Sequence, residues 1–369
     1  MSAPLRIAVL PGDGIGPEIT AAAVAVLERL DNALGLGLRL EMHPVGLGAL
    51  QRHGSTLPAQ VEQACRAADG ILVGPMDQLA YPPREQGGRN PSGELRLGLE
   101  LYANIRPSRS REGLPHWGRT PMDLVIVREN TEGFYADRNM FQGVGEFMPT
   151  ADLALSVRKI SAEGSRRIAT AGFELARARR RKVTAVHKSN VLKVTEGLWL
   201  REVRAVASQY PDVALEEQLV DSMAALLVRD AARYDVVLTT NMYGDILSDE
   251  AAELSGSLGL AASINAGDAH CMAQAQHGSA PDIAGKDLAN PASLVLSAGM
   301  LLGWLARRHG RDALAEAERR LEASVDALIR NPATRTRDLG GTLGTREWTR
   351  TLLTALSSGH TPDTKTPRA

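Results

Sequence analysis

The 369-residue chain is poor in several residue types, and each shortage excludes a class of protein. It has two cysteines, Cys65 and Cys271, which are far apart in the sequence and form no CxxC pair. Neither a disulfide framework nor a structural zinc site is therefore expected, and a reducing compartment fits this usage. Aromatic residues make up 4% of the chain, so its core must consist mainly of Ala, Leu, Val and Ile.

An excess of charge of one sign and a long apolar run are also missing. The formal net charge is -1, which argues against nucleic acid as a partner. A basic run at residues 177–182 is expected to be the solvated end of a helix, with a nucleic-acid patch as the alternative. No apolar run approaches the roughly 18 residues that span a bilayer, and no signal peptide precedes the first strand. We therefore expect a cytoplasmic protein with no membrane partner.

The chain does contain short β-branched runs that alternate with helical patterns. The expected strands are residues 5–10, 38–43, 70–74, 123–127, 182–187 and 235–239. A helix from Pro17 to Leu30 follows the first strand, because its apolar residues keep helical spacing. This alternation predicts an α/β fold with a mostly parallel sheet, whose ligands bind at the carboxyl ends of the strands. The length of the chain favours two lobes.

Three segments lie outside this pattern. Residues 76–92 are rich in proline, glycine and charge and are expected to form a mobile loop. Residues 134–150 have no helical period, which favours an extended arm. The polar residues after about Ser357 are expected to be a disordered tail.

A glycine-rich turn follows the first predicted strand. Gly12, Gly14 and Gly16 resemble part of the GxGxxG dinucleotide fingerprint, but residue 17 is proline where the third glycine would stand. Exposed amides between a strand and a helix can still approach an anion or a cofactor. A binding loop and a tight structural turn both remain open.

Two carboxylates stand four residues apart in a probable helix after residue 240. Asp245 and Asp249 would face one side, one turn apart, and would repel each other unless a cation lies between them. Oxygen ligands suit Mg²⁺ or Mn²⁺. A solvated acidic face is the alternative, which the apolar Ile246 and Leu247 disfavour because they imply partial burial.

Several cationic residues lie near predicted strand ends or loops. Arg96, Arg106 and Arg128 would grip a dicarboxylate through bidentate hydrogen bonds, although surface ion pairs are the simpler reading of each alone. Lys188 follows a predicted strand and is a candidate base, and Tyr135 follows the loop after Arg128. The joint occurrence of these residues points to a site.

Six blocks of the chain together resemble the isocitrate/isopropylmalate dehydrogenase family. They follow the order of that family from about residue 5 to residue 355. The blocks are residues 10–18, 101–107, 127–133, 187–193, 241–249 and 277–285.

The resemblance implies a fold of two α/β lobes that is not a true Rossmann fold. Residues 1–101 and 255–369 would form a cofactor-binding lobe. Residues 102–254 would form a substrate, metal and dimerisation lobe that carries the arm 134–150. The family forms homodimers with shared active sites.

The resemblance also assigns the site residues. Arg96, Arg106 and Arg128 would bind the carboxylates of a malate-like hydroxy acid, with Ser92 and Asn190 as further substrate contacts. Tyr135 and Lys188 would be the acid–base pair. Asp245 and Asp249 would bind Mg²⁺ or Mn²⁺ together with a third carboxylate, Asp221, from the partner subunit, and Lys188 would cross the interface too. Asp221 would also take part in proton transfer.

A nicotinamide cofactor is implied by the same resemblance. Asp282 would accept hydrogen bonds from the adenosine ribose and repel a 2′-phosphate, so the expected cofactor is NAD. The remaining cofactor contacts would be Gly74, Asn241, His277, Gly278, Ser279, Ala280, Ile283 and Asn290. Gln274 replaces a family glutamate near the cofactor.

The expected reaction is oxidative decarboxylation of a (2R)-malate-type acid with a C3 substituent. The leucines that pack the isopropyl group in isopropylmalate enzymes are replaced by Ser92 and Gly93. Arg89 is a candidate to reach the substituent from its loop. The isocitrate, homoisocitrate, tartrate and D-malate branches all remain open. The alternatives are a tartrate-type dehydrogenase without obligatory decarboxylation and a non-catalytic regulatory subunit.

Overall fold

The computed structural model describes residues 3–134 and 145–357, and the chain divides into two compact units. Unit 1 comprises Met1–Arg89, Arg111–Leu114 and Met272–Ala369, and unit 2 comprises Asn90–Ser110 and Pro115–Cys271. Both units are discontinuous in sequence. Residues 90–101 and 255–271, which we expected in the first lobe, lie in unit 2. Among the helices of the described ranges, none combines the length and apolarity that a membrane crossing requires.

The strands of unit 1 form a parallel array. Their order is β2-β1-β3-β12, and every neighbouring pair runs parallel. They are β1 (Leu5–Leu10), β2 (Leu38–Met42), β3 (Gly70–Val73) and β12 (Cys271–Gln274). The first three confirm the sequence prediction to within one residue at each end. The sequence did not predict β12.

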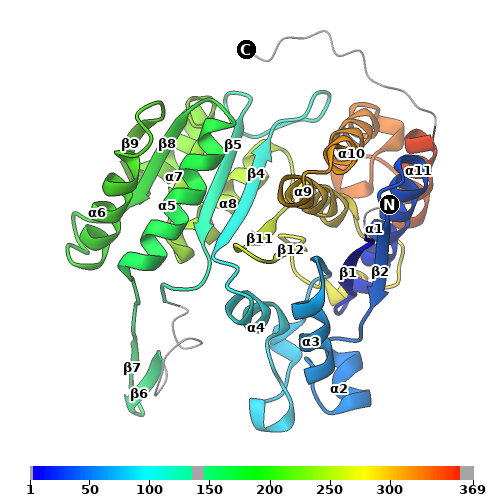
Figure 1. Ribbon diagram of the computed structural model, residues 1–369, viewed down its shortest axis with the longest axis horizontal. Coiled ribbons are helices and arrows are strands. Elements are labelled where there is room, and N and C mark those ends of the chain that lie inside the picture. Colours follow the sequence, from blue (N-terminus) through cyan, green and yellow to red (C-terminus); the bar gives the residue numbers. More distant parts are fainter. Residues whose placement is uncertain (1–2, 135–144, 358–369) are drawn as a thin grey trace. The chain divides into compact units, whose positions relative to one another are not determined.

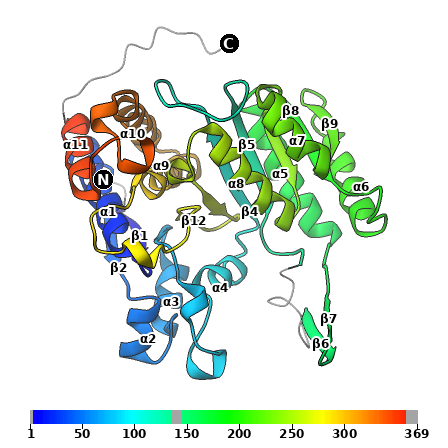
Figure 2. The same cartoon turned by 180° about the vertical axis from the view of Figure 1, so that it is seen from behind.

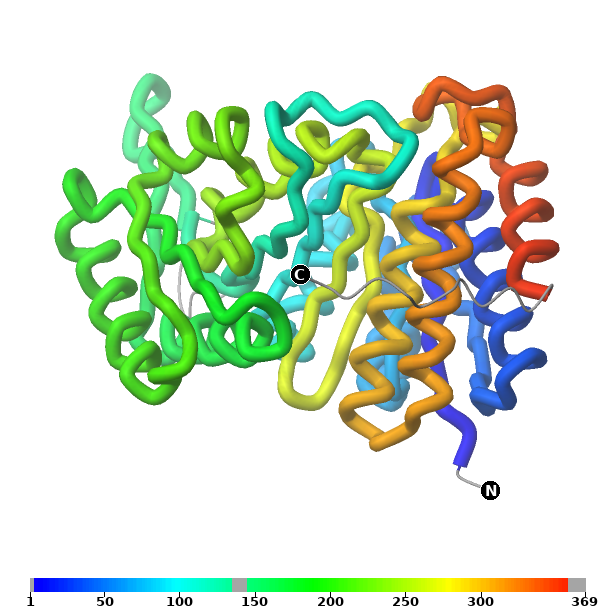
Figure 3. The backbone as a smooth tube through the Cα atoms, turned by 90° about the horizontal axis from the view of Figure 1, so that it is seen from above, coloured from blue at the N-terminus to red at the C-terminus, as the bar shows by residue number. Residues whose placement is uncertain are grey.

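In the part of unit 1 that the structure describes, six α-helices accompany these strands. They are α1 (Gly16–Leu34), α2 (Leu47–His53), α3 (Ala59–Ala67), α9 (Ala292–His309), α10 (Asp312–Arg330) and α11 (Thr345–Ser357). Helix α1 runs past the predicted Leu30 and ends at Gly35, whose left-handed conformation caps it. It packs against α9 and α11, and α9 pairs with α10 through a turn at Gly310 (Figure 3).

The sheet of unit 2 is mixed. Its order is β11-β4-β5-β10-β8-β9. These strands are β4 (Ala103–Arg109), β5 (Asp123–Glu129), β8 (Lys182–His187), β9 (Ala214–Leu219), β10 (Val236–Thr239) and β11 (Ile264–Ala266). Strand β4 runs antiparallel to both β5 and β11, whereas the other pairs are parallel. The mostly parallel sheet is confirmed, with β4 as an exception that the sequence did not reveal.

Helices cover both faces of the unit 2 sheet (Figures 1 and 2). They are α5 (Ala162–Arg177), α6 (Thr195–Ala207), α7 (Val220–Asp230) and α8 (Asn241–Ser255). A further helix of this unit, α4 (Pro91–Gly98), precedes β4 in the sequence. Val125 and Val127 of β5 pack with α5 and α6, whereas Leu124 and Ile126 pack with α7 and α8. Alternate residues of one strand therefore build two separate cores.

A two-stranded ribbon departs from the unit 2 sheet (Figures 1 and 2). It consists of the antiparallel strands β6 (Glu146–Thr150) and β7 (Leu153–Ser156), and all their residues are exposed. The strands lie within and just after the expected arm, of which residues 135–144 are outside the described ranges.

The segment expected to be a mobile loop is fastened to unit 1. It contains two short 3₁₀ turns, Gln78–Ala80 and Arg84–Gln86. The Thr56 hydroxyl donates to the Arg89 carbonyl at 2.7 Å. The Arg89 guanidinium donates to the Leu57 carbonyl at 2.8 Å and pairs with Glu62 at 3.0 Å. Arg89 is therefore held by unit 1, and its contact with the substituent stays a prediction.

The basic run ends helix α5, as the sequence predicted. Arg179 bridges Asp235, at 2.7 Å, and Asp123, at 2.8 Å, beside the amino ends of β10 and β5. Arg177 pairs with Asp212 at 3.3 Å. These carboxylates pair with two arginines of the run, which fits the expected helix end.

Candidate active site

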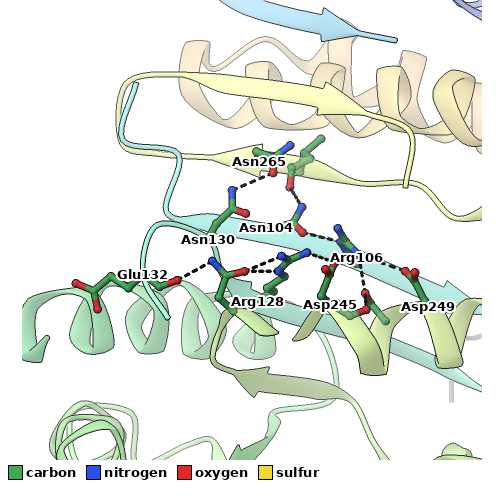
Figure 4. A network of polar contacts seen from close by, with 11 residues as sticks. Asn104, Arg106, Arg128, Asn130, Glu132, Asp245, Asp249 and Asn265 are labelled. Atoms are coloured by element: carbon green, nitrogen blue, oxygen red, sulfur yellow. Dashed lines mark hydrogen bonds and ion pairs between the residues drawn. The ribbon is translucent and has the colours of Figure 1, made fainter. Parts of the chain in front are cut away.

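Two buried arginines lie on neighbouring strands of unit 2 (Figure 4). Arg106 of β4 is 5% exposed and Arg128 of β5 is 4% exposed. Arg106 donates from Nε to Asn104 at 2.6 Å and from Nη1 to Ser248 at 2.8 Å. Burial, followed by the nearby charge of Arg128, lowers the pKa of Arg106 to about 10. Two cations placed this close away from water require anions.

The start of helix α8 orients Arg128. The Asn241 side-chain oxygen accepts from Arg128 Nε at 2.9 Å and from Nη2 at 2.6 Å. The Asn241 amide group donates to the Glu132 carbonyl at 3.0 Å. Asn241 therefore fixes the plane of the Arg128 guanidinium group and links it to the loop after β5. Its predicted contact with the cofactor stays a prediction.

Asp245 and Asp249 supply the anions for the two guanidinium groups. Arg106 Nη1 lies 3.2 Å from Asp245 Oδ1 and 3.4 Å from Asp249 Oδ1, and Arg128 pairs with Asp245 as well. The prediction that both carboxylates face one side of a helix is confirmed. Their side chains are 38% and 54% exposed, so each also reaches solvent. Leu247 is buried, but Ile246 is 60% exposed, which the sequence reasoning missed.

The donor set of α8 fits a hard divalent cation. Two carboxylates one helical turn apart, partly exposed and with oxygen as their donor atom, suit Mg²⁺ or Mn²⁺. Within the described ranges of one chain, no group of three or more His, Cys, Asp or Glu side chains could hold a metal ion. Asp221, the expected third ligand, lies at the start of α7 and contacts Lys188 of its own chain.

Lys188 and Asp221 form a pair at the carboxyl edge of β8. Lys188 Nζ donates to Asp221 Oδ1 at 2.7 Å. This hydrogen bond lowers the pKa of the Asp221 carboxyl. Lys188 follows β8 directly, and Asn190 is exposed two residues further on. The two residues expected to cross the subunit interface are therefore adjacent.

Two other predicted substrate residues of unit 2 belong to helix α4. Ser92 is buried in its first turn and Arg96 is half-buried in its last turn. The Asn90 side chain caps the helix by accepting from Gly93 N at 3.0 Å. Tyr135, the predicted acid, lies outside the described residues.

Close backbone approaches in unit 1 explain the glycine-rich turn. Ile15 N donates to the Ser279 carbonyl at 2.8 Å, and a Cβ on Gly14 would lie 2.0 Å from that oxygen. A Cβ on Gly74 would lie 2.0 Å from the Pro11 carbonyl oxygen. Only glycine fits at these two positions, so the turn, the end of β3 and the loop 277–283 lie together.

The loop 277–283 presents unused polar groups. His277 Nδ1 donates to the Gly278 carbonyl at 3.0 Å, and burial lowers the pKa of the ring. Its Nε2 is buried and has no hydrogen-bond partner among the described residues. Gly278 faces open space, Ala280 is left-handed at φ +37°, and Asp282 is exposed beside Ile283. This arrangement fits a nucleotide with ring and hydroxyl groups.

Asn290 links the end of the loop to the start of α9. Its amide donates to Asp338 at 2.9 Å and its oxygen accepts from Ala292 N at 3.0 Å. The side chain thereby fixes the end of the loop, and its contact with adenine stays a prediction.

The comparisons with known proteins agree with this geometry. The family model described as isocitrate/isopropylmalate dehydrogenase matches residues 6–352. The chain belongs to this family. It is 40% identical to the 3-isopropylmalate dehydrogenase of Deinococcus radiodurans, over 96% of this chain and 98% of that protein. It is 41% identical to the isocitrate/homoisocitrate dehydrogenase of Thermus thermophilus, over 96% and 99%.

A solved structure supports the assignment of the fold. The isocitrate dehydrogenase of Methylococcus capsulatus is 37% identical and superposes with a TM-score of 0.84, over 95% of this chain and 99% of that chain. The expected family and fold are therefore confirmed, and the chain is an isocitrate/isopropylmalate-type dehydrogenase.

The structure of this dehydrogenase adds polar residues that sequence reasoning missed. Asn104 and Ser248 satisfy Arg106, and Asn130 donates to Asn265 at 3.0 Å beside them. Glu129 accepts from Thr131 Oγ1 at 2.6 Å, and burial raises the pKa of the Glu129 carboxyl. Glu129 and Asn130 belong to one of the blocks that resemble the family. The sequence therefore marked this segment as part of the site, but it did not indicate what these two side chains do.

Proposed function

We propose that this dehydrogenase oxidises and decarboxylates a (2R)-malate-type acid with a C3 substituent, using NAD and Mg²⁺ or Mn²⁺. The observation that carries the proposal is the network of Figure 4. Two buried arginines are pre-oriented beside two half-exposed aspartates in it. Cations for substrate carboxylates thus lie next to oxygen ligands for a metal ion.

Arg106 and Arg128 would bind the carboxylates of the acid, with Arg96 from α4. Their orientation is fixed before binding, because Asn104, Ser248 and Asn241 already hold the guanidinium groups. Such preorganisation reduces the side-chain entropy lost when an anion binds.

Asp245 and Asp249 would hold the divalent cation with Asp221 of the partner subunit. When bound, the cation supplies Lewis acidity that stabilises negative charge on the substrate oxygens. Lys188 would accept the proton of the C2 hydroxyl, and a bound NAD would supply the acceptor for the hydride of C2. After the bond from C3 to its carboxylate breaks and CO₂ leaves, Tyr135 would return a proton to C3.

Asp282 supports NAD as the cofactor. It is exposed on a loop whose neighbours leave space for a nucleotide, and its charge repels a 2′-phosphate. Initial rates with NAD and NADP test this assignment, and a lower KM for NADP would contradict it.

A homodimer is supported by exposed apolar residues around the predicted interface elements. The ribbon exposes Phe147, Met148, Leu153 and Leu155. Ile246, next to Asp245, and Val191, close to Lys188, are exposed as well. A soluble chain rarely leaves such groups uncovered.

The C3 substituent is proposed to be polar. Ser92 is buried at the start of α4, where the family's isopropylmalate enzymes need an apolar wall. The relatives named for isopropylmalate and for isocitrate/homoisocitrate are 40% and 41% identical to this chain, so overall similarity does not distinguish the two substrates. The buried hydroxyl of Ser92 is what favours a carboxyalkyl group.

One experiment tests the proposed reaction. NADH and CO₂ are measured with Mn²⁺ on isocitrate, homoisocitrate, isopropylmalate, D-malate and tartrate. We expect one carboxyalkyl acid to be preferred, with one CO₂ per NADH. Preference for isopropylmalate would overturn the polar substituent. NADH without CO₂ would establish the tartrate-type alternative, and no NADH from any acid would contradict the reaction.

A further inference from the structure

A buried ion pair lies beside the backbone of the proposed base, Lys188, in unit 2. Arg158, in the segment between β7 and α5, is paired with Glu196 in the first turn of α6. Their side chains are 8% and 0% exposed. Burying two full charges is costly, and an apolar pair would fill the space at less cost. The pair therefore calls for an explanation other than stability.

Each end of this pair contacts a different part of the proposed machinery. Glu196 Oε2 accepts from the backbone N of Lys188 at 3.1 Å. The carboxylate thus holds the main chain of the proposed base, while its other oxygen pairs with Arg158.

The Arg158 guanidinium reaches helix α8. Its Nη2 donates to Thr240 Oγ1 at 3.1 Å, and its central carbon lies 5.3 Å from the centre of the Tyr243 ring. Thr240 directly precedes the helix that carries Asp245 and Asp249. The guanidinium group thus donates to a hydroxyl at its edge and forms a cation–π contact with an aromatic ring.

The same guanidinium also contacts the residue before Tyr135. Its central carbon lies 5.6 Å from the centre of the Phe134 ring. The backbone repeats this link, because Gly133 N donates to the Lys159 carbonyl at 2.9 Å and Lys159 N donates back at 3.0 Å. Arg158 thus joins three segments, namely the loop that ends at Phe134, the Lys188 turn and the first turn of α8.

We propose that Arg158, through Glu196, is a positioning residue that sets the proposed base, Lys188, relative to the carboxylates of α8. Arg158 would act through Glu196 and Thr240. This role rests on the proposed function, because it needs Lys188 to be the base.

The kinetic test compares Arg158→Met, Arg158→Lys and a matched control. Arg179→Met also removes an arginine from a buried carboxylate of unit 2, Asp235, but beside the opposite ends of the strands. We expect kcat of Arg158→Met to fall about 100-fold, the effect of small misplacements in a site. KM should change little, because Arg106 and Arg128 remain. Arg158→Lys should recover about tenfold of this loss, since it keeps the charge without the planar fork.

The pH profile of kcat should shift for Arg158→Met and stay unchanged for Arg179→Met. A structural role alone would lower the stability of both variants and leave kcat per folded molecule unchanged. Equal kcat and equal pH profiles in Arg158→Met and wild type would overturn the proposal.

Hydrogen exchange separates this proposal from the proposed reaction. In Arg158→Met, amide exchange should accelerate together at residues 132–134, 188–192 and 240–244, and in Arg179→Met it should not. If wild type oxidises none of the acids, the reaction is wrong and exchange still tests the link. Acceleration confined to residues 157–160 would refute the link itself.

Discussion

A buried guanidinium is tolerated when an acceptor faces its N–H groups, and Arg128 meets this condition with side chains of α8. Asn241 accepts from two of its nitrogens, and Asp245 takes a third. The fork geometry matters here as much as the charge, because one amide oxygen receives both Nε and Nη2. A lysine offers a point charge and cannot reproduce this arrangement.

Arg128→Lys is therefore expected to lower kcat/KM for the hydroxy acid about 100-fold, or roughly 2.7 kcal/mol. The KM for NAD should stay close to that of wild type. Arg204→Lys is the control, since Arg204 forms an equally bidentate pair with Glu217 on the surface at 2.6 and 2.7 Å. Exposed pairs contribute little, so this variant should retain full activity. Similar losses in both variants would contradict the assignment of Arg128.

The sequence identified the charged members of the site and missed the neutral ones. Asp245 and Asp249 are four apart on a helix, a spacing that predicts a shared face without further information. Asn104 and Ser248 carry no such signal, because asparagine and serine occur in many environments. The contact of Asn104 and Ser248 with Arg106 follows from the fold, in which the antiparallel pairing of β4 with β5 places Arg106 beside Arg128.

At the scale of elements, the α9–α10 pair contains a carboxyl group where an apolar contact is usual. Glu318 of α10 lies against Gly303 of α9, whose added Cβ would be 2.0 Å from Glu318 Oε2. Burial raises the pKa of Glu318 to about 7, opposed by Arg307 and Arg319 and reinforced by Glu322. The folded protein therefore holds a proton that the unfolded chain, with an ordinary glutamate, releases near pH 4.5.

The contribution of Glu318 to the free energy of unfolding should thus be full below pH 4.5 and be lost as the pH rises to about 7. Glu318→Gln keeps the neutral shape at every pH. Relative to wild type, the variant should become more stable as the pH rises from 4.5 to about 7. The gain should reach on the order of 2 kcal/mol at pH 8. Urea unfolding at pH 5 and pH 8 measures the difference. An equal offset at both values would show that Glu318 has no raised pKa.

Elements with one clear periodicity were predicted well, and short or polar ones were not. Strand β8 has its predicted bounds, since its β-branched run is buried on both faces. Strand β9 was missed because Ala214–Leu219 contains two glutamates and lies at the sheet edge. Strand β11 has three residues, too few for a period to appear.

For the whole molecule, the proposed homodimer makes a prediction that one chain alone does not. Lys188 and Asp221 would serve the site of one subunit, and Asp245 of the other subunit would complete it. Lys188→Met and Asp245→Asn should each be inactive alone. Mixed and re-associated in equal amounts, they should recover about a quarter of wild-type activity, because half the dimers are hybrids with one intact site.

The control for this experiment mixes Asp245→Asn with Asp249→Asn, whose defects fall on the same side of the site. A hybrid of these two has no intact site, because each chain carries one of them. Recovery in the control, or none in the test mixture, would contradict shared sites while leaving the reaction itself intact.

The ion pairs of Figure 4 make the two kinds of ligand depend on each other. Arg106 and Arg128 are paired with the carboxylates of α8. Whichever ligand binds first, the cation or the dicarboxylate, must therefore break these ion pairs. The second ligand then binds to side chains that are already unpaired. Thermodynamic reciprocity then requires a cation and a dicarboxylate to raise each other's affinity by one common factor, roughly tenfold. Titrations of Mn²⁺ with and without a dicarboxylate that lacks a hydroxyl group, and so cannot chelate through one, measure this coupling. Independent binding would mean that these ion pairs already open freely in solution.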